Sequence, residues 1–164
     1  MTHADQVVRA LRGIVGEEQV LCEPALLAAY ETATFATAPR IRAVVLPENA
    51  DQVQAIVRAA NEHRFALYPV SRGRNWGLGS RVPVQDGNVV LDLHRLDRIV
   101  EFNEELSYVT VEPGVTFSQI VDFLKSRGSQ LYVPVIGGPP DASLLANTLQ
   151  RGDGLGPLGD HCRH

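Results

Sequence analysis

Residues 41–70, IRAVVLPENADQVQAIVRAANEHRFALYPV, contain two apolar runs on either side of a helical pattern. The first run, Ala43 to Leu46, stops at Pro47, and the second extends from Ala66 to Val70. Short apolar runs that end at Pro or at polar residues are typical of strands. The stretch therefore predicts a βαβ unit whose two strands are parallel.

The helix between these runs has both a start signal and a buried face. Asn49 is of a residue type that caps helices, and Gln52 stands at the second position of a capping box. The residues spaced along one helical face are Val53, Ile56, Val57 and Ala60. We expect this helix to end near Glu62.

The remaining chain mixes short helices and short strands. Further helices are predicted at Ala4 to Val15, Pro24 to Tyr30 and Ser143 to Leu149, and strands at Val89 to Leu93, Arg98 to Phe102 and Tyr108 to Glu112. Thr116 and Gln119 form a second capping box, which opens a helix that stops at Gly128. This order of elements predicts an α+β fold.

The composition of the 164 residues, 45% hydrophobic and 21% charged, is that of a globular protein. A net charge of -4 with interspersed signs argues against a nucleic-acid-binding surface. Cys22 and Cys162 fit neither a disulfide framework nor a CxxC motif, which favours a reducing cytosol. The N-terminus lacks the apolar core of a signal peptide, and no stretch approaches the ~20 apolar residues of a spanning helix.

Residues 69–80, PVSRGRNWGLGS, place three glycines and two arginines directly after the second strand. Gly73, Gly77 and Gly79 can take positive φ and let backbone N–H groups approach a ligand. The Rossmann spacing fails because Val82 stands where the third glycine belongs, and no Gly-Lys-Ser/Thr closes a P-loop. Two interpretations are left: a backbone nest with arginines around a phosphate, or a long surface turn.

Three stretches in this order resemble the FAD-binding domain of the vanillyl-alcohol oxidase and p-cresol methylhydroxylase (PCMH) flavoproteins. They are PVSRGRNWGLGS, NVVLDLHRLDRIVEFNEELSYVTVEPGVTF and ANTLQRGDGLGPLGDH, within a resemblance that extends from Ile41 to His161. In that family FAD lies extended between two α+β subdomains, and a separate cap domain forms the substrate pocket. The resemblance implies a helical lead-in (1–40), a first subdomain (41–128) and a C-terminally truncated start of the second (129–164), with the cap domain absent.

The same resemblance implies which residues contact FAD. The diphosphate loop and the strand residue before it would be Pro69, Ser71, Arg72, Gly73, Arg74, Asn75, Trp76, Gly77, Leu78 and Gly79. The turn near the adenosine end would be Glu112, Pro113, Gly114 and Val115. The segment along the diphosphate and flavin would contain Asn147, Thr148, Arg151, Gly152, Gly154 and Gly159. Trp76 would either pack beside the loop or stack on the ligand.

Asp160 matches an acidic residue that lies close to the reactive flavin nitrogen in relatives, so it is the candidate catalytic residue. His161, Cys162 and His164 follow it, but their spacing fits no standard zinc pattern, and no metal is expected. His94 is expected to be a surface residue after a strand.

The sequence departs from the family's pattern at three places. Phenol-oxidising members have a tyrosine where this chain has Leu78, which weakens the case for a 4-hydroxyphenyl substrate. Other branches attach the flavin to a histidine near the place of Asn75, which cannot form that bond. The chain also stops four residues after Asp160, where the family continues.

Three functional hypotheses follow. The first is the FAD-binding portion of a flavin-dependent oxidoreductase that acts on an alcohol or alkylphenol, with weak or no turnover by this short chain alone; its partners would be FAD and a cap domain or second chain. The second is a non-catalytic remnant that binds a nucleotide or serves as an interaction module. The third is a NAD-binding Rossmann domain.

Overall fold

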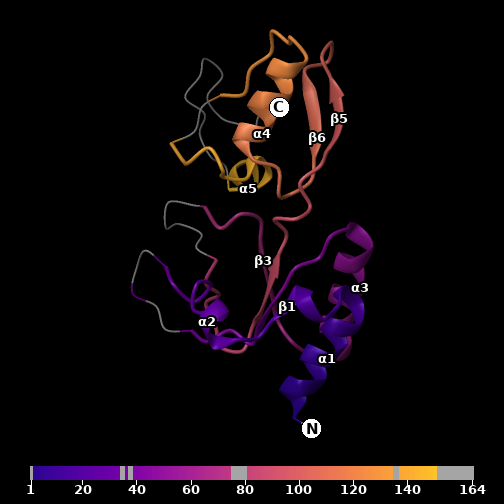
Figure 1. Ribbon diagram of the computed structural model, residues 1–164, viewed down its shortest axis with the longest axis vertical. Helices are drawn as coiled ribbons and strands as arrows, with labels where there is room; N and C mark the ends of the chain where they lie inside the picture. The colour runs from indigo at the N-terminus through magenta and orange to yellow at the C-terminus, as the bar shows by residue number, and fades with distance from the viewer. Residues whose placement is uncertain (1, 34–35, 37–38, 75–80, 135–136, 151–164) are drawn as a thin grey trace. The chain divides into compact units, whose positions relative to one another are not determined.

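The computed structural model describes residues 2–33, 36, 39–74, 81–134 and 137–150 (Figure 1). The chain divides into two compact units, unit 1 (Met1–Arg95) and unit 2 (Leu96–His164). The division into a lead-in and two FAD-binding subdomains, at 1–40, 41–128 and 129–164, stays a prediction. No helix within the described ranges is long and apolar enough to cross a membrane.

Unit 1 contains a four-stranded sheet in the order β1-β2-β4-β3. Its strands are β1 (Val20–Leu21), β2 (Ala43–Val45), β3 (Leu67–Val70) and β4 (Val89–Asp92). β1 is antiparallel to β2, while β2 and β3 both run parallel to β4. The predicted βαβ unit is therefore present, with its helix α3 (Ala50–Glu62) between β2 and β3 in the chain.

β2 and β3 are parallel, as predicted, but they are not neighbours in the sheet, because β4 lies between them. All four residues of β4 are buried, so the central position shields its apolar side chains on both faces. β3 carries Pro69, which has no N–H to donate and is tolerated at an edge. Burial and the missing donor together explain the order of the strands.

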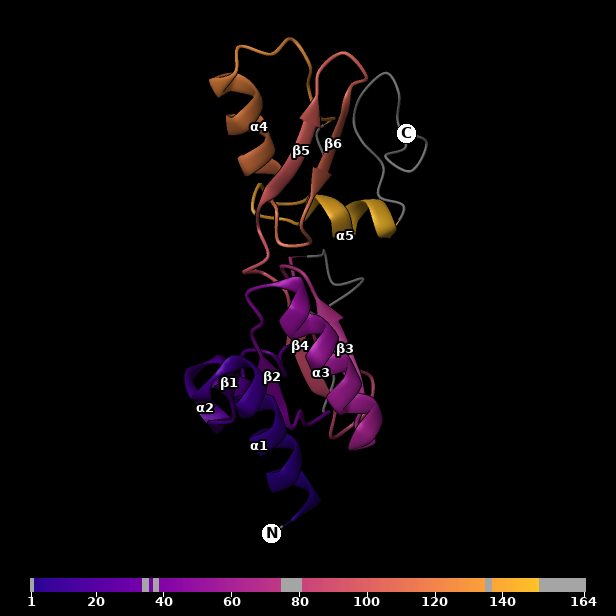
Figure 2. The ribbon, with the colours of Figure 1, turned by 90° about the vertical axis from the view of Figure 1, so that its right-hand side faces the viewer.

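Two apolar clusters cover the two faces of this sheet. On one face α1 (His3–Val15) and α3 pack on alternate strand residues, as Figure 2 shows. This cluster includes Val7, Leu11, Ala43, Val45, Ile56, Val89 and Leu91. The opposite face buries Val44 and Val90 with Leu27, which belongs to α2 (Pro24–Leu27). A short 3-10 helix, Glu17–Gln19, connects α1 to β1.

The helix starts follow the predicted capping residues, with one difference. The Asn49 side chain accepts a hydrogen bond from the backbone N–H of Gln52 at 2.9 Å, as an N-cap does. The Gln52 side chain accepts from Glu48, one residue before the cap, at 2.8 Å. At α4 (Phe117–Ser126) both halves of the Thr116–Gln119 capping box are present.

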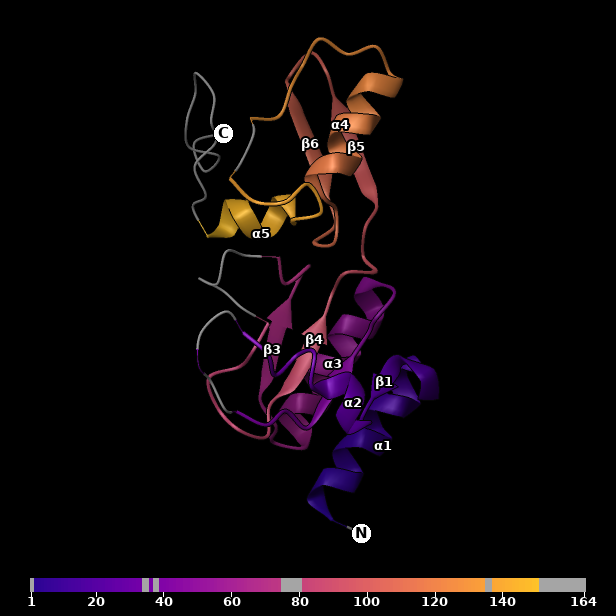
Figure 3. The ribbon, with the colours of Figure 1, turned by 60° about the vertical axis from the view of Figure 1, so that its left-hand side comes forward.

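Unit 2 combines a hairpin with two helices. β5 (Ile99–Asn103) and β6 (Tyr108–Val111) are antiparallel, and α4 packs on them (Figure 3). The centre of this contact is formed by Val115, Ile120 and Leu124. The last described helix, α5 (Leu144–Leu149), begins at the N-cap Ser143.

Candidate cofactor-binding site

The predicted diphosphate loop begins at the carboxyl edge of the parallel strands of unit 1. Val70 ends β3 and is in register with Asp92, which ends β4. Ser71 to Arg74 follow immediately, and the predicted contacts at 75–79 lie outside the described residues. The carboxyl ends of parallel strands are where open α/β sheets bind their ligands. The start of the loop is therefore at a position suited to a cofactor.

Gly73 occupies a position that only glycine fits without strain. Its φ is +62°, in the left-handed region, and an added Cβ would lie 3.0 Å from Cδ of Arg81. The absence of a side chain lets Arg81 lie against the main chain at this point. A main-chain turn with a residue in the left-handed conformation is the kind of backbone that binds anions, so Gly73 fits a loop around the FAD diphosphate.

The structure adds a polar network that sequence reasoning missed. The guanidinium of Arg81 lies 4.8 Å from the centre of the Tyr30 ring. The Tyr30 hydroxyl donates to Oδ2 of Asp92 at 2.7 Å. Because 62 residues separate Tyr30 from Asp92 in the chain, no local spacing could have indicated this contact.

Asp92 is buried at the end of β4 but well supplied with donors. Its Oδ1 accepts from the backbone N–H of His94 at 3.0 Å and lies 2.9 Å from Nδ1 of the same residue. His94 follows β4 with its side chain 39% exposed, in line with the predicted surface position, and it is anchored to Asp92. Burial raises the pKa of Tyr30 strongly, and the hydrogen bond to Asp92 adds to the rise, so the hydroxyl stays a donor.

The predicted adenosine-side turn, Glu112 to Val115, is held by contacts within unit 2. The Glu112 carboxylate accepts from the Arg98 backbone N–H at 2.9 Å, from Nε at 3.1 Å and from Nη2 at 2.6 Å. These hydrogen bonds lower the pKa of Glu112. The Gly114 N–H donates to Leu96 at 2.7 Å, and Val115 is fully buried. The turn is rigidly built, while its contact with FAD stays a prediction.

Two predicted residues lie on α5. The Asn147 backbone N–H donates to Ser143, and the Thr148 hydroxyl donates to Leu144 at 3.1 Å. Both contacts belong to the helix itself. Arg151, Gly152, Gly154, Gly159 and the candidate acid Asp160 lie outside the described residues.

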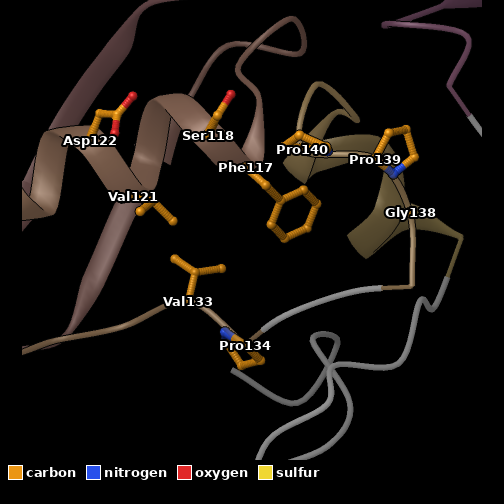
Figure 4. Close-up of a pocket in the computed structure, with 9 residues that line it drawn as sticks. All are labelled: Phe117, Ser118, Val121, Asp122, Val133, Pro134, Gly138, Pro139 and Pro140. Atoms are coloured by element: carbon orange, nitrogen blue, oxygen red, sulfur yellow. The ribbon is translucent and has the colours of Figure 1, made fainter.

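Unit 2 also has an apolar hollow of about 370 Å³ near the start of α4 (Figure 4). In the close-up the Phe117 ring, Val121 and Val133 face the space, while the Asp122 carboxylate points away. Among the residues that the structure describes, none of those predicted to contact FAD lines this hollow.

Comparison with known proteins identifies the family. The model of the FAD binding domain family matches residues 41–162. The chain is 48% identical over 160 residues to the 1'-carboxy-chondrochloren decarboxylase of Chondromyces crocatus, covering 98% of this chain and 30% of that protein. It is 35% identical over 164 residues to the 4-cresol dehydrogenase [hydroxylating] flavoprotein subunit of Pseudomonas putida, covering 96% of this chain and 31% of that protein.

A solved structure of p-cresol methylhydroxylase with substrate bound matches with a TM-score of 0.89 and 34% identity, covering 98% of this chain and 32% of that one. The fold is the PCMH-type FAD-binding fold, and the chain belongs to the FAD binding domain family. Its cofactor is accordingly FAD. The chain spans about 30% of the length of the curated relatives it matches first.

Proposed function

We propose that this chain is the FAD-binding portion of a flavin-dependent oxidoreductase of the vanillyl-alcohol oxidase and PCMH group, located in the cytoplasm. The observation that carries the proposal is Gly73 at the carboxyl edge of β3 and β4, where a positive φ and the packed Arg81 leave no room for a side chain. When bound, FAD accepts a hydride from the substrate and passes the electrons on.

In this proposal the chain's own residues bind and orient the cofactor. Main-chain groups from Ser71 to Gly79 hold the diphosphate, with Arg72 and Arg74 as neighbouring cations. Glu112 to Val115 contact the adenosine end, and the residues from Asn147 to Gly159 follow the diphosphate and flavin. Asp160 lies beside the reactive flavin nitrogen. A cap domain or a second chain completes the substrate pocket.

The substrate we propose is an alcohol or an alkylphenol. Relatives that support it are the 4-cresol dehydrogenase subunit and a 4-ethylphenol oxidase from Gulosibacter chungangensis, the latter matching with a TM-score of 0.89 and 30% identity. A decarboxylase at 48% identity favours a second candidate, the removal of a carboxyl group from a carboxylated substrate.

Binding of FAD to the purified chain is the first test. Occupancy at 100 times the Kd adds about 2.7 kcal/mol to the free energy of unfolding, and the protein retains yellow flavin on gel filtration. A colourless protein whose melting temperature does not change on addition of millimolar FAD would instead support a non-catalytic remnant. A shift with NADH that FAD does not cause would point to a NAD-binding domain.

A further inference from the structure

Gly73 and Arg81, near the two ends of the predicted diphosphate loop, are in contact. The position of a Cβ on Gly73 would be 3.0 Å from Cδ of Arg81 and 3.3 Å from its Cβ and Cγ. The methylene part of the Arg81 side chain thus lies on the main chain of Gly73. This contact joins two points that are separated by residues 74–80 in the chain.

Tyr30 holds the charged end of the same arginine. The guanidinium carbon lies 4.8 Å from the ring centroid, within the range of a cation–π contact. Tyr30 comes from the turn after α2, where its backbone N–H donates to Leu27 at 2.8 Å. Arg81 is therefore held between the loop and a turn that precedes it by about 50 residues in sequence.

Asp92 connects Tyr30 to the sheet. The hydroxyl of Tyr30 donates to Oδ2 at 2.7 Å, and the carboxylate is buried at the last residue of the central strand. The carboxylate also accepts the backbone N–H of His94, so its orientation is fixed from the other side. A buried carboxylate is costly unless donors surround it, and the donors here come from two distant parts of unit 1.

We propose that Asp92, Tyr30 and Arg81 form a clamp that holds the two ends of the diphosphate loop together at the edge of the sheet. These are positioning residues: they act through Gly73 and the loop. Holding the ends of a loop removes part of the entropy that a ligand would otherwise have to remove on binding. The clamp thereby sets the affinity for FAD, and this consequence rests on the proposed function.

A double-mutant cycle on FAD affinity tests the clamp. Tyr30→Leu and Arg81→Met are each expected to weaken FAD binding about tenfold, and the double variant also about tenfold, because either change opens the same contact. Tyr30→Phe keeps the ring but loses the hydroxyl, so we expect a loss of about threefold. Losses that multiply to about a hundredfold in the double variant would overturn the proposal.

Two control substitutions remove the same two kinds of contact, a tyrosine–carboxylate hydrogen bond and a cation–π contact, in unit 2. The Tyr108 hydroxyl donates to Glu101 at 2.5 Å, and the Arg127 guanidinium lies 4.5 Å from the centre of the Phe123 ring. Tyr108→Phe and Arg127→Met remove an equivalent hydrogen bond and an equivalent cation–π contact. Both are expected to change FAD affinity less than about twofold.

Limited trypsin digestion without FAD separates failure of the clamp from failure of the proposed function. Cleavage after Arg72 and Arg74 is expected to be about fivefold faster in Tyr30→Leu than in the parent, while cleavage after Arg58 in α3 stays unchanged. Equal rates in parent and variant would overturn the clamp even if FAD binds. Cleavage that is faster in Tyr30→Leu than in the parent, combined with a parent that binds no FAD, would support the clamp and contradict the proposed function.

Discussion

At the scale of single residues, Glu112 is predicted to contact the cofactor, and in the structure its carboxylate is hydrogen-bonded to Arg98. Arg98 supplies three hydrogen bonds to its carboxylate, and these lower the pKa of Glu112. A carboxyl group whose pKa is lower in the folded state stabilises the fold above its unfolded pKa, ~4.3 for glutamate. That contribution is lost as the pH falls through the folded pKa.

Glu112→Gln should therefore lower the melting temperature at pH 7, because it removes the charge that Arg98 stabilises. The decrease should be only roughly 2 °C, since the Arg98 side of the pair is exposed to water. The difference between variant and parent should shrink as the pH falls below the unfolded pKa of ~4.3 and disappear once the pH has passed the lowered folded pKa. Thermal unfolding followed by circular dichroism at several pH values measures this. A difference that stays constant down to pH 3 would show that the charge of Glu112 is not responsible.

Gly73 makes a second prediction at this scale. Gly73→Ala should weaken FAD binding at least about tenfold, since the new Cβ meets Arg81 and the left-handed φ costs about 1–2 kcal/mol. Gly128 has nearly the same φ, +64°, but nothing lies within 4 Å of an added Cβ. Gly128→Ala should destabilise the chain by a similar amount and leave FAD affinity unchanged, as equilibrium titration can determine. Equal FAD affinities for Gly73→Ala and the parent would rule out the proposed role of Gly73.

At the scale of elements, α4 depends on its first turn. Thr116 is buried, its hydroxyl accepts a hydrogen bond from the Gln119 N–H at 3.2 Å, and its own backbone N–H donates to Oε1 of Gln119 at 2.8 Å. The cap is thus satisfied in both directions, and it holds the helix at the point where it packs on β5 and β6.

Thr116→Ala should lower the free energy of unfolding by about 1 kcal/mol, because it leaves a helix N–H without its acceptor. Ser126→Ala, at the other end of the same helix, is the control; its exposed hydroxyl donates to Phe123. We expect that change to stay within about 0.5 kcal/mol. Urea unfolding distinguishes the two, and equal effects would show that the capping box is not important for α4.

At the scale of the whole molecule, the two units have separate apolar cores. Ile56 is fully buried in the unit 1 cluster beneath α1 and α3, and Ile120 is nearly fully buried in the cluster of unit 2. The two clusters have no residue in common. Substitutions in them should accordingly act independently.

Ile56→Val and Ile120→Val should each cost about 1 kcal/mol of unfolding free energy. The double variant should lose the sum of the two within about 0.5 kcal/mol. Denaturant unfolding of the four proteins tests this, with the slope against denaturant as a check that the transition is unchanged. A clear departure from the sum would mean that the two cores are coupled.

Much of the fold could be predicted from the sequence because its signals are local. Helix starts at Asn49 and Thr116 depend on residues three positions away, and both caps are confirmed. Short apolar or alternating runs predict five of the six described strands, whereas β1 (Val20–Leu21), only two residues long, carries no such signal. The FAD binding family was recognised from three stretches of sequence, which the family match at 41–162 confirms.

The tertiary structure decided what depends on residues far apart in the chain. Sequence patterns predicted β2 and β3 as a parallel unit, but only folding places the more buried β4 between them. In the same way, Tyr30 and Asp92 have no common local pattern, yet the sheet edge brings the hydroxyl and carboxylate within 2.7 Å. Capping and periodicity are properties of neighbouring residues, whereas strand order and buried polar contacts depend on how the whole chain satisfies burial and hydrogen bonding together.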